Sequence, residues 1–294
     1  MRFRKITIIG VGLLGGSIGL AVKRRSPATR VTGFVRRKAG VRECLNAGAV
    51  DVAVTDLAAA VAGADLVVLC TPLAQMQALA REIVPALKRG AVVTDVGSVK
   101  ASVVREVESL VQKAGGCFVG SHPMAGAEKN GVAAARANLF EQTVCILTPT
   151  ARTSQAALKK VEHFWKQIGS RVIKMRPELH DALVSRSSHL PHLIAAALAN
   201  YVLKPEPSRL QATLCATGFR DTTRIASGSP EMWRDIALSN RRHLSRSLAD
   251  YISDLQEILR WVKSGDAQRL MRFFETAKNR RDGWCSGCTS PSPE

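Results

Sequence analysis

The chain has 294 residues, of which 46% are hydrophobic and 22% are charged, a balance typical of a globular protein with a sizeable core rather than a disordered or fibrous one. The formal net charge of +18 favours anionic ligands, including dinucleotides, carboxylates and nucleic acids. However, aromatic residues make up only 5%, and the basic residues are spread along the chain. We therefore expect a solvated basic surface and no nucleic-acid partner.

No apolar stretch reaches the roughly 18–20 residues that span a bilayer, so we expect no membrane segment. The most apolar segment, residues 190–203, is too short and is expected to be a buried helix. Most of the seven cysteines stand singly among apolar neighbours, as reduced thiols do. Only Cys285 and Cys288 pair, too few for a zinc site. These features predict a cytoplasmic protein without a metal, ending in a disordered tail over residues 285–294.

Residues 5–9 form a β-branched run, followed by a G-x-G-x-x-G turn and a stretch with helical periodicity. In this context the glycines permit a tight turn, close approach of a pyrophosphate and close packing of helix on strand. The helix N-terminus then faces the phosphates with its unpaired N–H groups. We expect the turn to bind a dinucleotide through Gly10, Gly12, Leu13, Leu14 and Gly15.

Further apolar runs alternate with helix-like segments through the first half of the chain. Strands are expected at 30–35, 64–70, 91–98, 118–123, 143–149 and 171–175, and helices at 76–87, 102–113 and 155–168. This alternation predicts an α/β domain, a Rossmann-type doubly wound sheet over residues 1–175. Ligands bind such sheets beyond the carboxyl ends of the strands. Four residues follow strands directly and are expected to line one crevice: Thr71, Pro72, Ser98 and His122.

The end of the second predicted strand distinguishes between dinucleotides. An enzyme that uses NAD usually carries an acid there to bind the ribose hydroxyls, whereas this chain has Val35, followed by Arg36 and Arg37. Two guanidinium groups suit the 2′-phosphate of NADP. A basic surface turn is the alternative interpretation. We expect NADP to be preferred and NAD to be possible.

From residue 176 onward the pattern is helical, which predicts an all-helical substrate and dimerisation domain over residues 176–284. His180, His189 and His192 lie within thirteen positions and indicate a polar pocket, without the acidic residue of a familiar zinc motif. The long helices expected over residues 240–278 are suited to packing against a partner chain.

The segment "TGFRDTTRIASGSPEMWRDI" concentrates arginine and aspartate around Gly228 and Pro230. Ser229 and Pro230 predict a helix start, as N-cap and first residue. An arginine among threonines also suits a carboxylate clamp. The residue chemistry alone leaves the structural and the functional interpretation open.

Five motifs occur together and in order: "GVGLLGGSIGLA", "DVGSVK", "GSHPMAGAEKNGV", "SHLPH" and "GFRDTTRIASGSPEMWRDI". With them the sequence resembles the prephenate dehydrogenase family, including arogenate and cyclohexadienyl dehydrogenases, over about residues 5–283. The resemblance implies oxidative decarboxylation of prephenate to 4-hydroxyphenylpyruvate, with hydride transfer to NAD(P)+, in tyrosine biosynthesis. It also implies a homodimer built through the C-terminal helices. The alternative substrate is arogenate, which would give tyrosine directly.

The resemblance also implies roles for particular residues. His122 would take the proton of the substrate hydroxyl, which suits an imidazole whose pKa lies near working pH. Ser98 would orient the hydroxyl and the nicotinamide together. Arg224 would bind a substrate carboxylate. The remaining expected substrate-binding residues are His192, Trp233, Asp221 and Glu128.

Two residues of the loop after the predicted strand 118–123 bear on substrate binding. Ala127 stands where relatives often carry threonine, so one hydroxyl contact is missing. Arogenate bears an ammonium group that calls for a carboxylate, whereas Asn130 in the same loop is neutral, which favours prephenate.

Two other classes of protein are the alternatives. Other NADP-dependent two-domain dehydrogenases usually rely on a lysine in the second domain, where this chain presents His192 and Arg224. A basic nucleic-acid-binding protein on a vestigial dinucleotide fold is the alternative from a different class. The presence of His122 and Ser98 argues against a vestigial site.

Overall fold

The computed structural model describes residues 3–126, 129–204 and 209–289. The chain forms two compact units, Met1–Leu244 and Ser245–Glu294. This division falls later in the chain than the expected boundary between residues 175 and 176. Within the described residues, no helix is both long enough and apolar enough to cross a bilayer.

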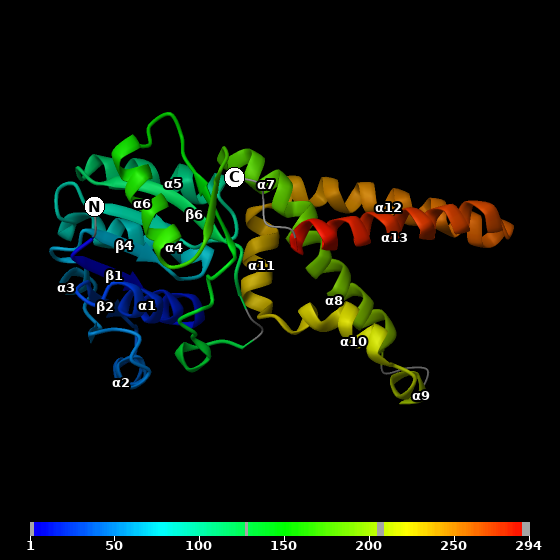
Figure 1. Cartoon of the computed structure of the whole chain (residues 1–294), viewed down its shortest axis with the longest axis horizontal. Helices are drawn as coiled ribbons and strands as arrows, with labels where there is room; N and C mark the ends of the chain where they lie inside the picture. The colour runs from blue at the N-terminus through cyan, green and yellow to red at the C-terminus, as the bar shows by residue number, and fades with distance from the viewer. Residues whose placement is uncertain (1–2, 127–128, 205–208, 290–294) are drawn as a thin grey trace. The chain divides into compact units, whose positions relative to one another are not determined.

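An eight-stranded sheet forms the centre of the first unit (Figure 1). The strands are β1 (Lys5–Ile9), β2 (Arg30–Phe34), β3 (Val52–Val54), β4 (Leu66–Leu69), β5 (Val92–Asp95), β6 (Cys117–Pro123), β7 (Val144–Thr148) and β8 (Arg171–Lys174). Their order is β3-β2-β1-β4-β5-β6-β7-β8, and neighbours are parallel from β3 to β6. β7 runs antiparallel to β6, and β8 runs parallel to β7. The doubly wound α/β prediction is confirmed; β3, only three residues long, was not predicted.

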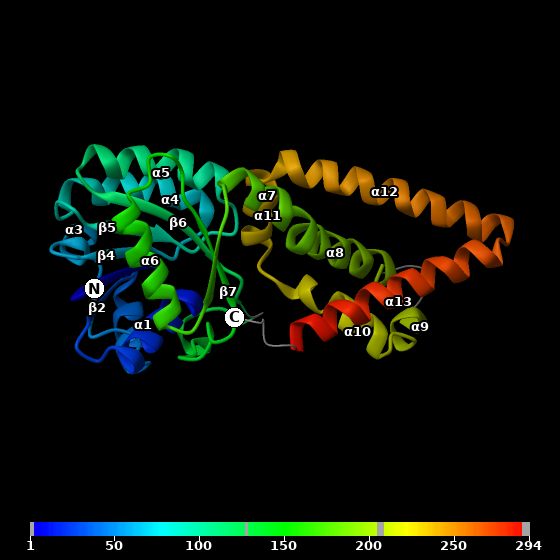
Figure 2. The same ribbon diagram turned by 45° about the horizontal axis from the view of Figure 1, so that its top comes forward.

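Helices cover both faces of this sheet (Figure 2). They are α1 (Leu13–Arg25), α2 (Lys38–Asn46), α3 (Leu57–Val61), α4 (Leu73–Ile83) with the short η1 (Val84–Ala86), α5 (Ala101–Lys113) and α6 (Gln155–Gln167). Side chains alternate along the strands: Leu66 and Val68 pack in one core cluster with α1 and α6, whereas Val67 and Leu69 pack in another with α4 and α5. Burial on both faces explains why the strands are continuous apolar runs.

The rest of the first unit is helical. It comprises α7 (Pro177–Val184), a π-helical turn η3 (Ser185–His189), α8 (Leu190–Val202), α9 (Arg209–Thr213), α10 (Thr217–Thr223), η4 (Arg224–Ser227) and α11 (Pro230–Ser239), and it reaches the start of α12 (Arg241–Ser264). α11 begins as predicted, because the Ser229 hydroxyl accepts a hydrogen bond from the Met232 N–H. The expectation that residues 190–203 form a buried helix is wrong: only Leu190 and Ala195 are buried, and Tyr201 is 72% exposed.

The second unit contains most of α12 and the helix α13 (Ala267–Thr289). The rings of Trp261 and Phe273 join the two helices at a centroid distance of 6.2 Å. Residues 285–289, where a disordered tail was expected to begin, are helical, and residues 290–294 lie outside the described residues. On α12, Ile252, Leu255, Leu259 and Val262 share one face and are exposed.

Candidate active site

The glycine turn between β1 and α1 has the geometry of an anion-binding cradle. Gly10 has a φ of +94°, and a Cβ there would lie 2.6 Å from the Cys70 carbonyl oxygen. A Cβ at Gly15 would lie 2.2 Å from the Gly10 carbonyl oxygen, so α1 packs closely on the turn. Gly12 instead faces open space, and no side chain caps α1 at this position. Leu13 and Leu14 follow, both half-buried. The turn therefore leaves room for a phosphate at a helix N-terminus.

A second observation supports a ligand at this turn. The Thr71 hydroxyl, just beyond β4, is buried and has no hydrogen-bond partner among the described residues. Its Cγ2 lies 3.0 Å from the Cβ position built on Gly10, so the hydroxyl group belongs to the same cradle. Buried hydroxyls are nearly always paired, so an orphan here fits a bound group that supplies the partner. Pro72 follows as the exposed N-cap residue of α4. These residues fit a dinucleotide.

The arginine pair lies beside the same turn. The Gly10 N–H donates to the Phe34 carbonyl at 3.1 Å, which fixes the end of β2 next to the glycine loop. Val35 follows and is half-buried, and Arg36 and Arg37 are exposed at the start of α2. In the described stretch that follows β2, residues 35–37 include no acidic side chain.

His122 lies within β6 and belongs to a buried chain of polar groups. It is 7% exposed, and its Nδ1 lies 2.8 Å from Nε2 of His180. The His180 Nδ1 lies 2.7 Å from the Asp181 carboxylate, and both of these residues are almost completely buried. That carboxylate also accepts the N–H groups of Lys100 at 2.7 Å and Ala101 at 2.9 Å, where α5 begins. A line of hydrogen bonds thus joins β6, α7 and the N-terminus of α5.

A buried ion pair supports the same region. Asp95 at the end of β5 and Lys100 have completely buried side chains and contact each other. The Lys100 ammonium also donates to the Ser121 carbonyl at 2.8 Å, and Asp95 accepts the Ser121 N–H at 3.0 Å and the Gly97 N–H at 2.8 Å. Asp95 thus binds the residue before Ser98 and the residue before His122. The Asp95–Lys100 ion pair therefore fixes the loop of the half-buried Ser98 against the strand that carries His122.

His189, on the π-helical turn η3, is the third buried histidine. The Asn240 amide donates both to the Asp181 carbonyl at 2.8 Å and to Nδ1 of His189 at 3.1 Å. Neutral His189 therefore carries its proton on Nε2, and this buried atom has no partner among the described residues. Burial lowers the pKa of His189 to about 4, against the opposing influence of Asp181 and of the Ser98 backbone.

Burial also keeps the other two histidines neutral near pH 7. It lowers the pKa of His122 well below its usual value near 6.5, and the electrostatic influence of His180, Lys100 and His189 acts in the same direction. Burial lowers the pKa of His180 as well, and Lys100 adds to this, whereas Asp181 opposes it. A neutral imidazole can accept a proton, so His122 is in the form that a base requires.

Four of the predicted substrate-binding residues lie on helices of the described chain: His192, Asp221, Arg224 and Trp233. His192 stacks on Trp233 with a centroid distance of 3.6 Å, and its Nδ1–H donates to the Ser188 carbonyl at 2.9 Å. Both rings are half-buried. Arg224 on η4 and Asp221 on α10 are exposed, and both elements pack against α8, the helix that carries His192.

The structure thus groups His122 with His180 and Asp181, and His192 with Trp233. Glu128 and Ala127 lie outside the described residues. The sequence predicted a polar pocket around His180 and His189 but not four buried residues of the same region: Asp95, Lys100, Asp181 and Asn240. Lys100 closes the motif "DVGSVK" that carries Ser98, and Asp181 follows His180 directly, so a charged residue close to Ser98 and to His180 was the available signal.

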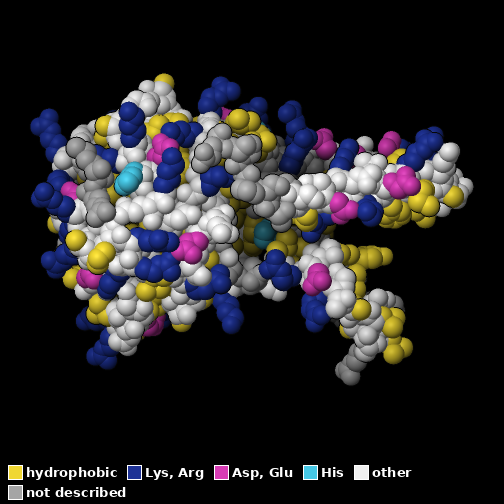
Figure 3. Space-filling view, in the orientation of Figure 1, with side chains coloured by type: hydrophobic (Ala, Val, Ile, Leu, Met, Phe, Trp, Pro, Cys, Tyr) yellow, Lys and Arg dark blue, Asp and Glu magenta, His cyan; other side chains and the backbone are white. Residues whose placement is uncertain are grey.

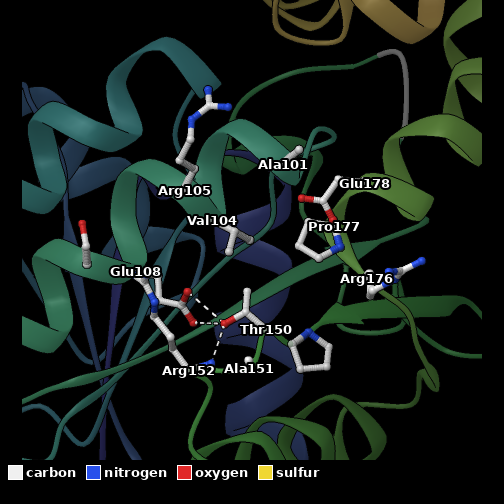
Figure 4. A pocket seen from close by; sticks show the side chains of 12 residues that line it. Ala101, Val104, Arg105, Glu108, Thr150, Ala151, Arg152, Arg176, Pro177 and Glu178 are labelled. Atoms are coloured by element: carbon white, nitrogen blue, oxygen red, sulfur yellow. Dashed lines mark hydrogen bonds between the residues drawn. The ribbon is translucent and has the colours of Figure 1, made fainter.

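A separate cavity of about 550 Å³ lies between the first turns of α5 and α7 and the loop after β7 (Figure 4). None of the predicted site residues lines it. Its buried acid, Glu108, accepts hydrogen bonds from the hydroxyls of Thr150 and Thr153. Its arginine side chains, Arg105, Arg152 and Arg176, point in different directions in Figure 4. The cavity is therefore not organised around one ligand group.

Lysine and arginine side chains are spread over the face shown in Figure 3 and do not gather in one patch. This distribution agrees with the expectation of a solvated basic surface.

A doubly wound sheet with an open glycine cradle, and a neutral buried imidazole on a neighbouring strand, define a class: oxidoreductases that bind a nucleotide cofactor. Two family models match the chain. The prephenate dehydrogenase nucleotide-binding domain matches residues 18–174, and the prephenate dehydrogenase dimerization domain matches residues 176–276.

Individual relatives agree with these models. Prephenate dehydrogenase of Bacillus subtilis is 37% identical over 280 residues, covering 95% of this chain and 75% of that protein. Cyclohexadienyl dehydrogenase of Zymomonas mobilis is also 37% identical, covering 95% of both chains. The crystal structure of prephenate dehydrogenase from Aquifex aeolicus with hydroxyphenyl propionate and NAD+ superimposes with a TM-score of 0.89 at 31% identity, covering 96% of this chain and 99% of that one. Arogenate dehydrogenase of Synechocystis has a TM-score of 0.81 at 30% identity, with coverages of 95% and 99%.

The chain belongs to the prephenate dehydrogenase family. It is therefore an oxidoreductase that acts on prephenate or arogenate, which confirms the resemblance seen in the sequence. The alternative of a nucleic-acid-binding protein finds no support in these relatives.

Proposed function

We propose that the protein oxidatively decarboxylates prephenate to 4-hydroxyphenylpyruvate and transfers the hydride to NADP+. The observation that carries this proposal is the neutral, buried His122, joined by hydrogen bonds to His180 and Asp181. When bound, the nicotinamide accepts the hydride from the ring carbon that bears the hydroxyl group. Carbon dioxide leaves from the opposite ring position, and aromatisation of the ring drives the reaction.

In this proposal, the residues of the chain handle the proton and hold the substrate. His122 takes the proton of the hydroxyl as the hydride departs. Ser98, beyond β5, aligns that hydroxyl with the nicotinamide. Arg224 binds a substrate carboxylate through charge-assisted hydrogen bonds. His192 and Trp233 contact the substrate side chain, while Asp221 and Glu128 orient this group of residues.

Prephenate is proposed over arogenate because of the charge in the loop after β6. Arogenate carries an ammonium group, whose recognition calls for a nearby carboxylate, whereas Asn130 is neutral. The relatives include both prephenate and arogenate dehydrogenases, so the substrate must be tested directly.

The decisive assay mixes purified protein with prephenate or arogenate, each with NADP+ or NAD+, and follows the absorbance of the reduced nicotinamide. Appearance of 4-hydroxyphenylpyruvate by mass spectrometry identifies the product. We expect the highest kcat/KM for prephenate with NADP+. Turnover of arogenate alone would contradict the proposed substrate, and turnover of neither would contradict the proposed function.

NADP is proposed over NAD because two exposed arginines follow β2, and Val35 stands where NAD enzymes carry an acid. We expect Arg36→Asp to raise the Kd for NADP+ about 10-fold or more, since a charge-assisted contact to the 2′-phosphate is lost, and to leave that for NAD+ nearly unchanged. Titration calorimetry with both dinucleotides measures this, with Arg42→Asp on α2 as control. An equal loss for both dinucleotides would contradict the phosphate contact.

The same proposal extends to assembly and location. The second family model is that of a dimerization domain, and α12 exposes a stripe of apolar residues, so we infer a homodimer through the C-terminal helices. We place the functional boundary between residues 175 and 176, with nucleotide binding before it. The scattered single cysteines favour a cytoplasmic location.

A further inference from the structure

His122 has two ring nitrogens, and only an unprotonated one can take a proton from the substrate. Its Nδ1 is engaged in the hydrogen bond with Nε2 of His180. The other nitrogen, Nε2, makes no hydrogen bond to any described residue. Which nitrogen carries the proton in neutral His122 therefore decides whether the base works.

The hydrogen bonds around Asp181 settle this question. Its carboxylate can only accept, and it accepts two backbone N–H groups and Nδ1 of His180. His180 Nδ1 must therefore carry a proton. Because His180 is neutral, its Nε2 is then an acceptor, and the Nδ1 of His122 must donate to it. The remaining nitrogen of His122, Nε2, is left with a free lone pair.

We propose that His180 and Asp181 are positioning residues, which act in series to hold His122 in the tautomer with a proton on Nδ1 and a basic Nε2. The direction of every hydrogen bond in this series follows from the Lys100 and Ala101 N–H groups at the start of α5, because backbone N–H groups can only donate. The deduction depends on the proposed function only in naming Nε2 as the proton acceptor. Asp181, His180 and His122 are all nearly completely buried, so water does not compete for these bonds.

Two substitutions separate the positioning role from mere packing. In Asp181→Asn, the amide nitrogen can take the place of Oδ1, the atom that accepts both the Lys100 N–H and the Nδ1–H of His180. It then donates to His180, which reverses both imidazoles and places the proton of His122 on Nε2. With the amide nitrogen in the place of Oδ2, the original order is kept, and nitrogen NMR distinguishes the two arrangements. We expect kcat to fall about 100-fold while KM changes less than about 3-fold. His180→Gln keeps an acceptor for the Nδ1–H of His122 and should retain much more activity than Asp181→Asn.

The tautomer itself can be observed without substrate. ¹⁵N NMR of histidine-labelled protein distinguishes protonated from unprotonated ring nitrogens, and His122→Ala assigns the signals. We expect an unprotonated Nε2 in the wild type and a protonated one in Asp181→Asn, with exposed His163→Phe on α6 as control. Thermal melting and dinucleotide binding check that each variant folds.

The outcomes distinguish this inference from the proposed function. A wild-type enzyme that oxidises prephenate or arogenate but has its His122 proton on Nε2 overturns the positioning role alone. The same holds if Asp181→Asn folds and keeps full kcat with its His122 proton on Nε2, or loses kcat about 100-fold with that proton still on Nδ1. A wild-type protein that oxidises neither substrate contradicts the proposed function, whichever tautomer the spectra show.

Discussion

The group around His122 and the group around His192 are built differently, although both belong to the first compact unit. His122, His180 and Asp181 are buried and bonded to one another and to the backbone at the start of α5. His192 and Trp233 are half-buried and held mainly by stacking. In the proposed mechanism, proton transfer therefore falls to a buried, hydrogen-bonded group, whereas substrate recognition falls to helices that are still partly open to solvent.

The largest effect should come from removing His122, the proposed base, from the buried group. We expect His122→Ala to lower kcat about 1,000-fold, since general base catalysis contributes roughly 100- to 10,000-fold. Dinucleotide affinity should stay the same, because the glycine cradle is formed by other strands. Steady-state kinetics and calorimetry measure the two quantities, and His163→Ala serves as control. Unchanged turnover would remove His122 from the mechanism.

Next in size is the loss of the ion pair beneath this group. Lys100→Met leaves Asp95 buried without its cation, and breaking such a pair typically costs about 3–5 kcal/mol of unfolding free energy. Urea denaturation measures the loss. The double variant Asp95→Asn/Lys100→Met should recover part of it, and Lys113→Met at the exposed end of α5 should cost little. A single variant as stable as the wild type would show that the pair is not needed.

For the helices around His192 we expect an effect on substrate binding rather than on the rate of the chemical step. Arg224→Ala should raise KM for prephenate about 10- to 100-fold and change kcat only slightly, because a charged hydrogen bond contributes about 1.5–3 kcal/mol. Arg220→Ala, on α10, is the matched control. If kcat fell instead and KM stayed constant, Arg224 would belong to the chemical step and the comparison between the two groups would fail.

The smallest predicted effect is the pH dependence that His189 imposes on stability. Its pKa is about 4 in the folded state and near 6.5 in the unfolded chain, so the unfolded chain binds more protons between these values. Stability therefore falls as the pH drops below about 6.5, by about 2 kcal/mol at pH 5 from this residue alone. The lowered pKa values of His122 and His180 act with the same sign. Urea titrations at pH 7 and pH 5 measure the slope, which His189→Gln should reduce; an unchanged slope would exclude His189 as its source.

Much of the sheet could be predicted, because a strand buried on both faces has a continuous apolar sequence and a helix on the sheet has apolar residues at helical spacing. β1 was predicted at its observed bounds, and the cap of α11 was predicted from Ser229 and Pro230. β3 was missed because three half-buried residues leave no pattern. The burial of α8 was overestimated, because an apolar composition does not show what covers it.

The site residues divide in the same way. His122 and Ser98 could be nominated because local motifs carry them. The partners of His122 could not, since a hydrogen bond across 58 positions to His180 depends on how α7 packs against the sheet. The contact of Asn240 is still less predictable, because this residue binds Asp181 from 59 positions away in the sequence and lies in no recognisable motif.

The reversal of direction between β6 and β7 has an evolutionary consequence. His122 pairs with Ile146 inside this antiparallel ladder, so its main chain cannot be re-aimed without disrupting the strand pairing around it. Substitutions that change substrate specificity should therefore disturb the structure less on the helical elements than on this strand. A family that includes enzymes for prephenate and for arogenate is what the proposed arrangement, a base fixed in a strand and recognition residues on helices, would allow.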